Sequence, residues 1–256
     1  MTKHQAERYL ERIGCGERRE RGAEELERLV RAHLEHVPFE NLDVCEDGRI
    51  PELTESAVYE KVVERERGGW CFELNTLFWG LLEELGYRVY PVAVRVIWGR
   101  DRLPAVSHMG LVAVVQDRKY YCDVGYGGPG PKGCMALETG EQTIGGERFL
   151  VENPADGEYR ISRLHEGEWR GTLYFADRPV YREDFQLMNF YCARNPEVVF
   201  TRERVVYLCT PDGNKSLRGM ELTVKTRGQE NRTIYQNEEE LRKGLFSEFR
   251  LAKDKR

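Results

Sequence analysis

The chain has 256 residues, a formal net charge of -5 and a hydrophobic fraction of 40%. This length exceeds the needs of one small core, so we expect two or three closely associated subdomains that fold without disulfides. No apolar run approaches the ~20 residues of a membrane helix, and the start, MTKHQAERYLERIG, has no signal-peptide segment. Basic and acidic residues are interspersed, which argues against nucleic acid as a partner.

The cysteine and histidine patterns argue against a bound metal. The seven cysteines are scattered, odd in number and contain no CxxC pair, so neither a disulfide framework nor a structural zinc site is expected. His33 and His36 are three residues apart, but HLEH matches no zinc-binding helix pattern. We therefore expect reduced thiols in the cytoplasm, with no membrane association.

Apolar residues at helical spacing predict four helices in the first third of the chain. The first begins at a capping box at Thr2, and a second follows and stops at a proline. A third covers about 54–66, and the fourth starts near Cys71 and ends at Gly86, a suitable left-handed C-cap. These helices should form one bundle over residues 1–86.

From residue 87 the hydrophobic period changes to two, which predicts strands. Several strands separated by turn residues favour an antiparallel β-barrel or sandwich over 87–188. In 189–256, VVYLCT and MELTVKT should form a hairpin, and Asn237 caps a last helix. This third segment is therefore small and mixed, and the fold class is α+β.

The stretch RGGWCFELN at 67–75 places Cys71 at the start of a helix, directly after two glycines and a tryptophan. Glycines allow a sharp entry that leaves the thiol accessible and its N–H free to face an oxyanion. A helix N-terminus beside a histidinium lowers the pKa of a thiol. Cys71 is therefore a candidate nucleophile, although a lone helix-start cysteine is more often a core residue.

A base and a carboxylate are found further along the chain. His108 opens the strand SHMGLVAVV, and Asp123 is an acid within the otherwise apolar YYCDVGYG. An acid in that position can hold the imidazole tautomer. A two-residue turn at Asp117 and Arg118 would, however, place Asp123 opposite Val112, roughly 13 Å along the strand from His108. A bulge, another pairing or a third strand must then bring the two side chains together.

The segment GYGGPG at 125–130 matches the pattern GxGxxG. No amphipathic helix follows it, so a dinucleotide-binding fold is not expected. A loop whose free amides contact phosphate remains possible.

Taken together, these stretches resemble the arylamine N-acetyltransferase family from end to end. The resemblance rests on YLERIG, VPFENLDV, RGGWCFELN, SHMGLVAVV, CDVGYGG and FTRERVVYLCTPDG. It implies a Cys-His-Asp triad of Cys71, His108 and Asp123 on a cysteine-protease-like core. It also implies three parts, a helical bundle, a β-barrel and an α/β lid.

The resemblance assigns further roles. It implies that Arg67 and Glu40 form a structural ion pair near the nucleophile, and that Phe39 and Tyr126 line the acceptor pocket. It implies a cofactor-binding loop that comprises Gly125, Gly127, Gly128 and Gly130.

The family chemistry is ping-pong acetyl transfer, in which the cysteine takes the acetyl group of acetyl-CoA and passes it to an arylamine, arylhydrazine or N-hydroxyarylamine. Acetyl-CoA is then a substrate, no cofactor is bound permanently, and a role in xenobiotic metabolism is implied. The chain departs from the family at Tyr126, where many members have Phe, and at Val198, where PxSxF patterns have Ser; the long insertion of vertebrate members is absent. A cysteine hydrolase or transglutaminase-like enzyme and a non-catalytic binding module are the alternatives.

Overall fold

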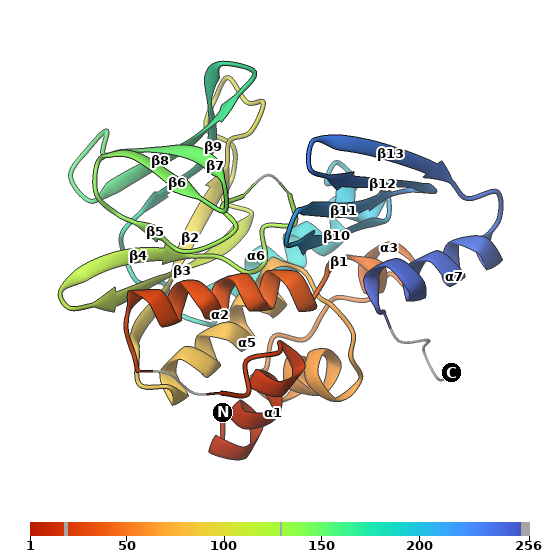
Figure 1. Ribbon diagram of the computed structural model, residues 1–256, viewed down its shortest axis with the longest axis horizontal. Coiled ribbons are helices and arrows are strands. Elements are labelled where there is room, and N and C mark those ends of the chain that lie inside the picture. The colour runs from red at the N-terminus through yellow and green to blue at the C-terminus, as the bar shows by residue number, and fades with distance from the viewer. Residues whose placement is uncertain (18–19, 129, 252–256) are drawn as a thin grey trace.

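The computed structural model describes residues 1–17, 20–128 and 130–251. A helical part lies beside a strongly curved sheet and a second, smaller sheet (Figure 1). The mixed α+β class expected from the sequence is confirmed. The helices are α1 (Lys3–Arg12), α2 (Ala23–His36), α3 (Leu42–Cys45), α4 (Glu55–Tyr59), the π-helix η1 (Glu60–Glu64), α5 (Cys71–Glu84), α6 (Asp184–Arg194), the 3-10 helix η2 (Val199–Thr201) and α7 (Glu238–Phe249).

Helix α5 is the centre of the helical part. Nearly every residue along it is buried, and it contacts α1 and α4 on one side and strands β2 (Arg88–Val96) and β3 (His108–Val115) on the other. Such a helix carries apolar residues on more than one face, and it also buries polar residues, among them Glu73 and Asn75. Its burial fixes the position of its first residue, Cys71, against the sheet.

Eight antiparallel strands form the curved sheet, in the order β5-β4-β3-β2-β9-β8-β7-β6. Its two edge strands, β5 and β6, are joined by a side chain: the Gln142 amide donates to the Ala136 carbonyl at 2.8 Å and accepts from the Ala136 N–H at 3.0 Å. These two hydrogen bonds of one glutamine thus take the place of the backbone hydrogen bonds between β5 and β6 that would close the barrel. The remaining strands of this sheet are β4 (Arg118–Cys122), β5 (Met135–Ala136), β6 (Gly140–Ile144), β7 (Glu147–Glu152), β8 (Glu158–His165) and β9 (Glu168–Ala176).

The β3–β4 hairpin has a different register from the one expected. Its turn is Gln116–Asp117, where both residues have positive φ, and Val115 pairs with Arg118. Two positive φ values give a turn whose twist suits a hairpin. The turn expected at Asp117–Arg118 is therefore wrong by one residue, and continuing the observed register brings Asp123 opposite Gly110, two residues nearer to His108.

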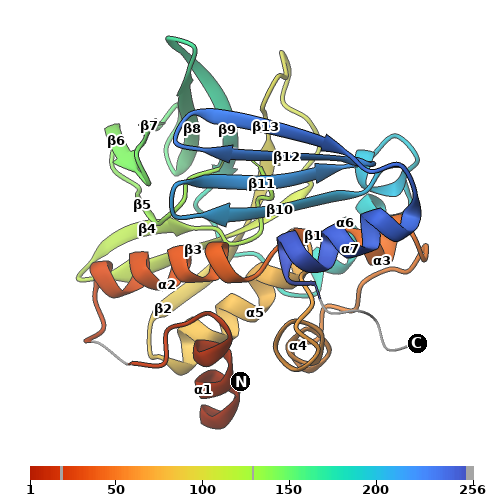
Figure 2. The same ribbon diagram turned by 45° about the vertical axis from the view of Figure 1, so that its right-hand side comes forward.

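The smaller sheet has the order β1-β10-β11-β12-β13. The expected hairpin of VVYLCT and MELTVKT is wrong, because a further strand, β11, lies between them and pairs with both. The strands are β1 (Phe39–Glu40), β10 (Val205–Thr210), β11 (Gly213–Arg218), β12 (Glu221–Thr226) and β13 (Gln229–Ile234). Figure 2 shows this sheet above α7, with its β10–β11 and β12–β13 turns directed toward the curved sheet. The division at residues 86 and 188 stays a prediction, and its last five residues, 252–256, lie outside the described residues.

No helix within the described ranges is long and apolar enough to cross a membrane. The same ranges contain no group of three or more His, Cys, Asp or Glu side chains placed to hold a metal ion. His33, on α2, is buried and its Nδ1 lies 2.5 Å from the Tyr9 hydroxyl. Burial lowers the pKa of His33 to about 3, so this ring is a neutral packing residue.

Replacing Gln142 with Met should cost about 1 kcal/mol of unfolding free energy, because two backbone groups of Ala136 lose their partners. Urea denaturation measures the change. Thr143→Met, on the exposed face of the same strand, is the control and should stay within about 0.5 kcal/mol of the parent. Equal losses in the two variants would show that Gln142 does not close the sheet.

Candidate active site

The turn before α5 has no room for side chains. A Cβ added to Gly68 would collide with the Pro38 carbonyl oxygen, and one on Gly69 would lie 3.0 Å from the Glu73 carboxylate. The Gly69 carbonyl accepts from the Glu40 N–H at 2.9 Å, so β1 runs directly against this turn. Two glycines therefore let the chain pass between β1 and α5 and place Cys71 at the first position of the helix.

Cys71 is buried, with only 4% of its surface exposed. The expectation of an accessible thiol is therefore wrong. Burial raises the pKa of Cys71 well above its ordinary value, and Cys192 and Asp123 add to the rise. Backbone hydrogen bonds from Met109 and Phe72 act in the lowering direction but are outweighed. The predicted lowering of the pKa by the helix N-terminus is thus wrong for the resting thiol, and a base is needed to remove its proton.

His108 and Asp123 meet in the buried interior. The His108 Nε2 atom lies 2.6 Å from Asp123 Oδ2, and both side chains are almost completely buried. Strand β4 ends at Cys122, so Asp123 leaves the ladder and its carboxylate turns toward the start of β3. The corrected hairpin register and the end of β4 together bring these two residues into contact.

Asp123 is the acceptor of several hydrogen bonds. Besides His108, Oδ2 accepts from the Tyr121 hydroxyl at 2.8 Å, and Oδ1 accepts from the Asn75 amide at 3.0 Å and the Gly125 N–H at 2.9 Å. Burial acts to raise the pKa of Asp123, but the charge of His108 and these hydrogen bonds lower it overall. The carboxylate therefore stays ionised and can support a positive imidazole.

Asn75 and Tyr121 were not identified from the sequence. The Asn75 amide also donates to the Met109 carbonyl at 2.7 Å, and its oxygen accepts from the Val124 N–H at 3.1 Å. The sequence signal was spacing. Asn75 is four residues after Cys71, on the same face of α5, and Tyr121 is two residues before Asp123, the spacing that places two side chains on one side of an extended chain.

The glycine-rich loop covers the nucleophile. A Cβ on Gly125 would lie 2.6 Å from the Cys71 Cα, and one on Gly127, where φ is +66°, would lie 2.5 Å from the Phe39 ring. Tyr126 stands edge-on to His108, with 5.6 Å between ring centroids. The structure thus brings both predicted acceptor-pocket residues, Phe39 and Tyr126, to this loop. Gly128 and Gly130 face the Tyr126 ring, and Pro129 of this loop lies outside the described residues.

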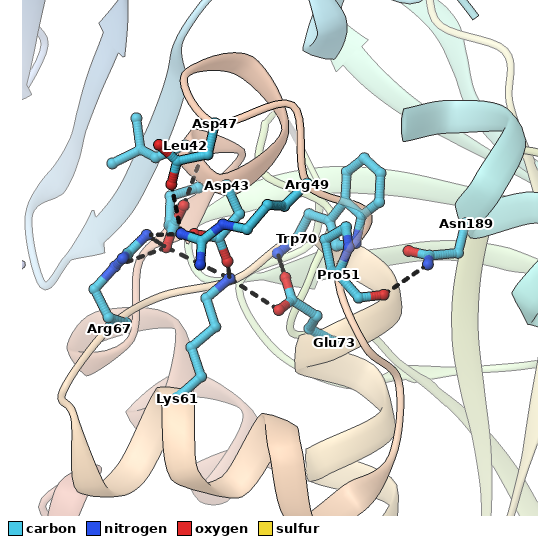
Figure 3. Close-up of polar contacts among 11 residues, drawn as sticks. Leu42, Asp43, Asp47, Arg49, Pro51, Lys61, Arg67, Trp70, Glu73 and Asn189 are labelled. Atoms are coloured by element: carbon cyan, nitrogen blue, oxygen red, sulfur yellow. Dashed lines mark hydrogen bonds and ion pairs between the residues drawn. The ribbon is translucent and has the colours of Figure 1, made fainter. Parts of the chain in front are cut away.

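A buried ion network supports the turn before α5 (Figure 3). Arg67 Nη2 lies 2.7 Å from Glu40, which places the expected pair in contact, and 3.3 Å from Asp43. Lys61, which the sequence did not single out, lies 2.8 Å from both Asp43 and Glu73. Glu73 in turn accepts from the Trp70 N–H at 3.0 Å. The network therefore fixes the N-terminus of α5.

The charges in this network depend on one another. Burial acts to lower the pKa of Lys61, but the neighbouring carboxylates, Glu40 first, raise it overall, so the ammonium stays charged. Burial raises the pKa of Glu73, and Lys61 opposes that rise. Removal of Lys61 would leave buried carboxylates without their main counter-charge.

The described side chains supply the parts of an acyl-transfer site. Cys71 is a candidate nucleophile at the start of α5, and His108 is a candidate base at the start of β3. Asp123 is placed to orient the imidazole and to stabilise its positive form. Because Nε2 of His108 is held by Asp123, Nδ1 is the ring nitrogen left for proton transfer.

Comparison with known proteins agrees with this chemistry. Residues 23–256 match the family model described as N-acetyltransferase. The arylamine N-acetyltransferase of Mycolicibacterium smegmatis is 34% identical over 226 residues, which covers 86% of this chain and 82% of that protein. The Salmonella typhimurium arylamine N-acetyltransferase structure superposes with a TM-score of 0.93 at 28% identity, over 98% of this chain and 92% of the other. The Mycobacterium marinum enzyme in complex with CoA has a TM-score of 0.87 at 27% identity, over 95% and 91%.

Lys61→Met should reduce the unfolding free energy by about 3 kcal/mol at neutral pH, because buried carboxylates lose their counter-charge. The pKa of Glu73, already raised, should rise further. A carboxyl with a raised folded pKa binds a proton more readily in the folded state, so stability increases as pH falls through that value. Urea denaturation at pH 8 and pH 5 should therefore show a smaller deficit at pH 5.

The matched control for this prediction is Lys243→Met, which breaks an exposed pair with Glu239 and should change stability by less than about 0.5 kcal/mol at either pH. Glu73→Gln added to Lys61→Met should recover part of the loss. If the loss of unfolding free energy is the same at pH 8 and pH 5, protonation of a buried carboxylate does not compensate for the missing ammonium.

Asp123→Asn tests two opposite effects on Cys71. The Asp123 charge raises the pKa of the thiol directly, but it also stabilises a charged His108, which would lower that pKa. If the second effect dominates, the midpoint of iodoacetamide alkylation should move to higher pH in the variant. A move to lower pH would show that Asp123 acts only as a nearby negative charge. Thermal melting of the same sample confirms that the variant is folded.

Proposed function

Because this chain belongs to the arylamine N-acetyltransferase family, we propose that it transfers the acetyl group of acetyl-CoA to an arylamine, arylhydrazine or N-hydroxyarylamine. The acetyl group passes through a thioester on Cys71. The observation that carries this proposal is the buried His108–Asp123 contact beside the helix start that bears Cys71. A structural cysteine would need neither group.

The first half-reaction acetylates the enzyme. Nδ1 of His108 takes the proton of the Cys71 thiol as Sγ attacks the thioester carbonyl, and Asp123 stabilises the imidazolium. The bond between the carbonyl carbon and the CoA sulfur then breaks, and the departing thiolate takes the proton from His108. The raised pKa of Cys71 is consistent with proton removal at the moment of attack.

The second half-reaction acetylates the acceptor. The amine nitrogen attacks the acetyl carbonyl, His108 removes a proton from that nitrogen, and Cys71 leaves and is reprotonated. Phe39 and Tyr126 are the proposed walls of the acceptor pocket, since both lie against the glycine-rich loop over Cys71. An aromatic acceptor can pack against such rings.

Location and physiological role are part of this proposal. The odd, scattered cysteines support the cytoplasm. The rings of Phe39 and Tyr126 beside the loop over Cys71 support a broad class of aromatic amines, including xenobiotic ones. Acetyl-CoA is a consumed substrate.

Brief mixing with acetyl-CoA should raise the intact mass by one acetyl group, and peptide mapping should place it on Cys71. Cys45, which is half-exposed, tests whether exposure decides labelling: Cys45→Ala should keep the full label and Cys71→Ala should lose it. Addition of an aromatic amine should then discharge the label as the acetylated amine. Discharge to water at the same rate without amine would favour a cysteine hydrolase instead.

A further inference from the structure

The Tyr121 side chain lies on the face of the curved sheet that carries His108. Strand pairing places Tyr121 opposite Val112, and His108 is four residues before Val112, on the same side of β3. Tyr121 is fully buried, and its ring stacks on Phe175 of β9 with 5.0 Å between the centroids. Its hydroxyl donates to Asp123 Oδ2 at 2.8 Å. A buried phenol therefore reaches the carboxylate that holds the imidazole.

Gly110 provides the space for this phenol. It lies between His108 and Val112 on the same face of β3, and a Cβ added there would lie 2.4 Å from the Tyr121 hydroxyl oxygen and 2.5 Å from the ring. The φ of Gly110 is not positive, so a left-handed backbone is not the reason for glycine. A glycine inside a strand often marks the close approach of another group. Gly110 and Phe175 together hold the Tyr121 hydroxyl in one place.

The Tyr121 hydroxyl and the His108 ring share one oxygen atom of Asp123. Oδ2 accepts from Tyr121 and lies 2.6 Å from His108 Nε2. The other oxygen, Oδ1, accepts from the Asn75 amide and the Gly125 N–H, so the carboxylate is oriented even without Tyr121. A hydrogen bond to an ionised carboxylate stabilises its charge. A carboxylate stabilised in this way gains less from a neighbouring imidazolium and holds that imidazolium less strongly.

Tyr121 is a permanent donor in this arrangement. Burial, with the Asp123 charge second, raises the pKa of Tyr121 well above its ordinary value. The phenol therefore stays neutral near pH 7, and its proton faces Oδ2.

The other ionisable groups around this cluster come from three further elements and from β4 itself. They are Cys71 on α5, Cys192 on α6, Tyr126 in the glycine-rich loop and Cys122 on β4. Burial raises the pKa of each, that of Cys192 to about 11, so all four are neutral near pH 7. Arg163 of β8 acts on Tyr126, but its charge is paired with Glu147 at 2.6 Å. Asp123 is thus the fixed charge that His108 meets directly.

We propose that Tyr121 is a positioning residue that acts through Asp123 and limits how strongly the carboxylate stabilises the positive form of His108. This inference rests on the proposed function, in which His108 accepts a proton and returns it in each half-reaction. A group suits both tasks when its two protonation states are close in free energy near the working pH. Without the competing phenol, Asp123 would favour the imidazolium and delay the return of the proton to the departing thiolate.

The direct test measures the protonation of the His108 ring. In the Cys71→Ala background, which removes the neighbouring thiol, NMR of ¹³C-labelled histidine follows the ring signal that disappears in His108→Gln. Tyr121→Phe removes the hydroxyl oxygen and keeps the ring that stacks on Phe175. Asp123 then gives more of its charge to the imidazolium, so the midpoint of the His108 titration should move to higher pH by about half a unit.

The same shift should appear in the reaction. The acid limb of the pH profile of kcat/KM for acetyl-CoA reports the base of the free enzyme. In Tyr121→Phe with Cys71 intact, this limb should move to higher pH by the same amount as the ring titration. A loss of rate that is equal at every pH would show a structural role and overturn the proposal.

Tyr90→Phe is the matched control. Tyr90, on β2 of the same sheet, donates its hydroxyl to Asp177 at 2.6 Å, so the variant loses a phenol–carboxylate hydrogen bond that does not involve Asp123. Neither the His108 midpoint nor the acid limb should move. A shift equal to that of Tyr121→Phe would overturn the assignment, because any lost phenol would then have the same effect.

A double variant tests whether Tyr121 acts through Asp123. Adding Tyr121→Phe to Asp123→Asn should leave the His108 midpoint of Asp123→Asn unchanged, because no charge remains to be shared. An undiminished shift in that background would overturn the proposal, as would an unchanged or lower midpoint in Tyr121→Phe alone.

A second measurement keeps every side chain in place. Fluorotyrosine incorporated instead of tyrosine is a stronger hydrogen-bond donor, so the His108 midpoint should move to lower pH, and an unchanged or higher midpoint would contradict the proposal. If acetyl-CoA does not acetylate the unchanged protein, the proposed function fails. The ring titrations still decide separately whether Tyr121 acts on His108 through Asp123.

Discussion

The side-chain amide of Asn75 joins the two halves of the candidate active site. It donates to the Met109 carbonyl and to Asp123, and it accepts from the Val124 N–H. Helix α5 carries Cys71, whereas His108 and Asp123 belong to the β3–β4 region, so this one fully buried amide ties the helix to the sheet. Each of these partners is also buried, and a buried polar group that loses its hydrogen bond is costly. The relative position of nucleophile and base is therefore a property of the core rather than of a flexible surface.

The start of α5 is fixed on its other side by charge. Glu73 reaches back to the Trp70 N–H, and Lys61 holds Glu73. Arg67 and Glu40 extend the same network to β1. A network of buried ions adds little net stability compared with apolar packing, but it allows few alternative geometries once every member is paired. Hydrogen bonds thus orient the face of α5 toward the sheet, while ion pairs hold the turn that precedes it.

Much of this could be predicted from the sequence because it depends on residue type and local spacing. The helical period located α5, and the chemistry of a thiol, an imidazole and a carboxylate selected Cys71, His108 and Asp123. Register could not be predicted in the same way, because Gln116 and Asp117 adopt positive φ without being glycine. Strand β13 was missed because all its residues are exposed and mostly polar, so no alternation marks it. Network partners such as Lys61 depend on tertiary contacts that no local pattern records.

The glycine-rich loop both lies against Cys71 and lines a cleft between the two sheets. This loop starts at Gly125, whose N–H is bonded to Asp123 and whose Cα lies against Cys71. It ends near Lys132, which contacts the smaller sheet through Gly213. Water must be kept from an acetyl-cysteine, and the same loop covers Cys71 and forms part of the wall of the cleft. Changes that loosen the loop should consequently weaken the protection of the acetyl-cysteine from water.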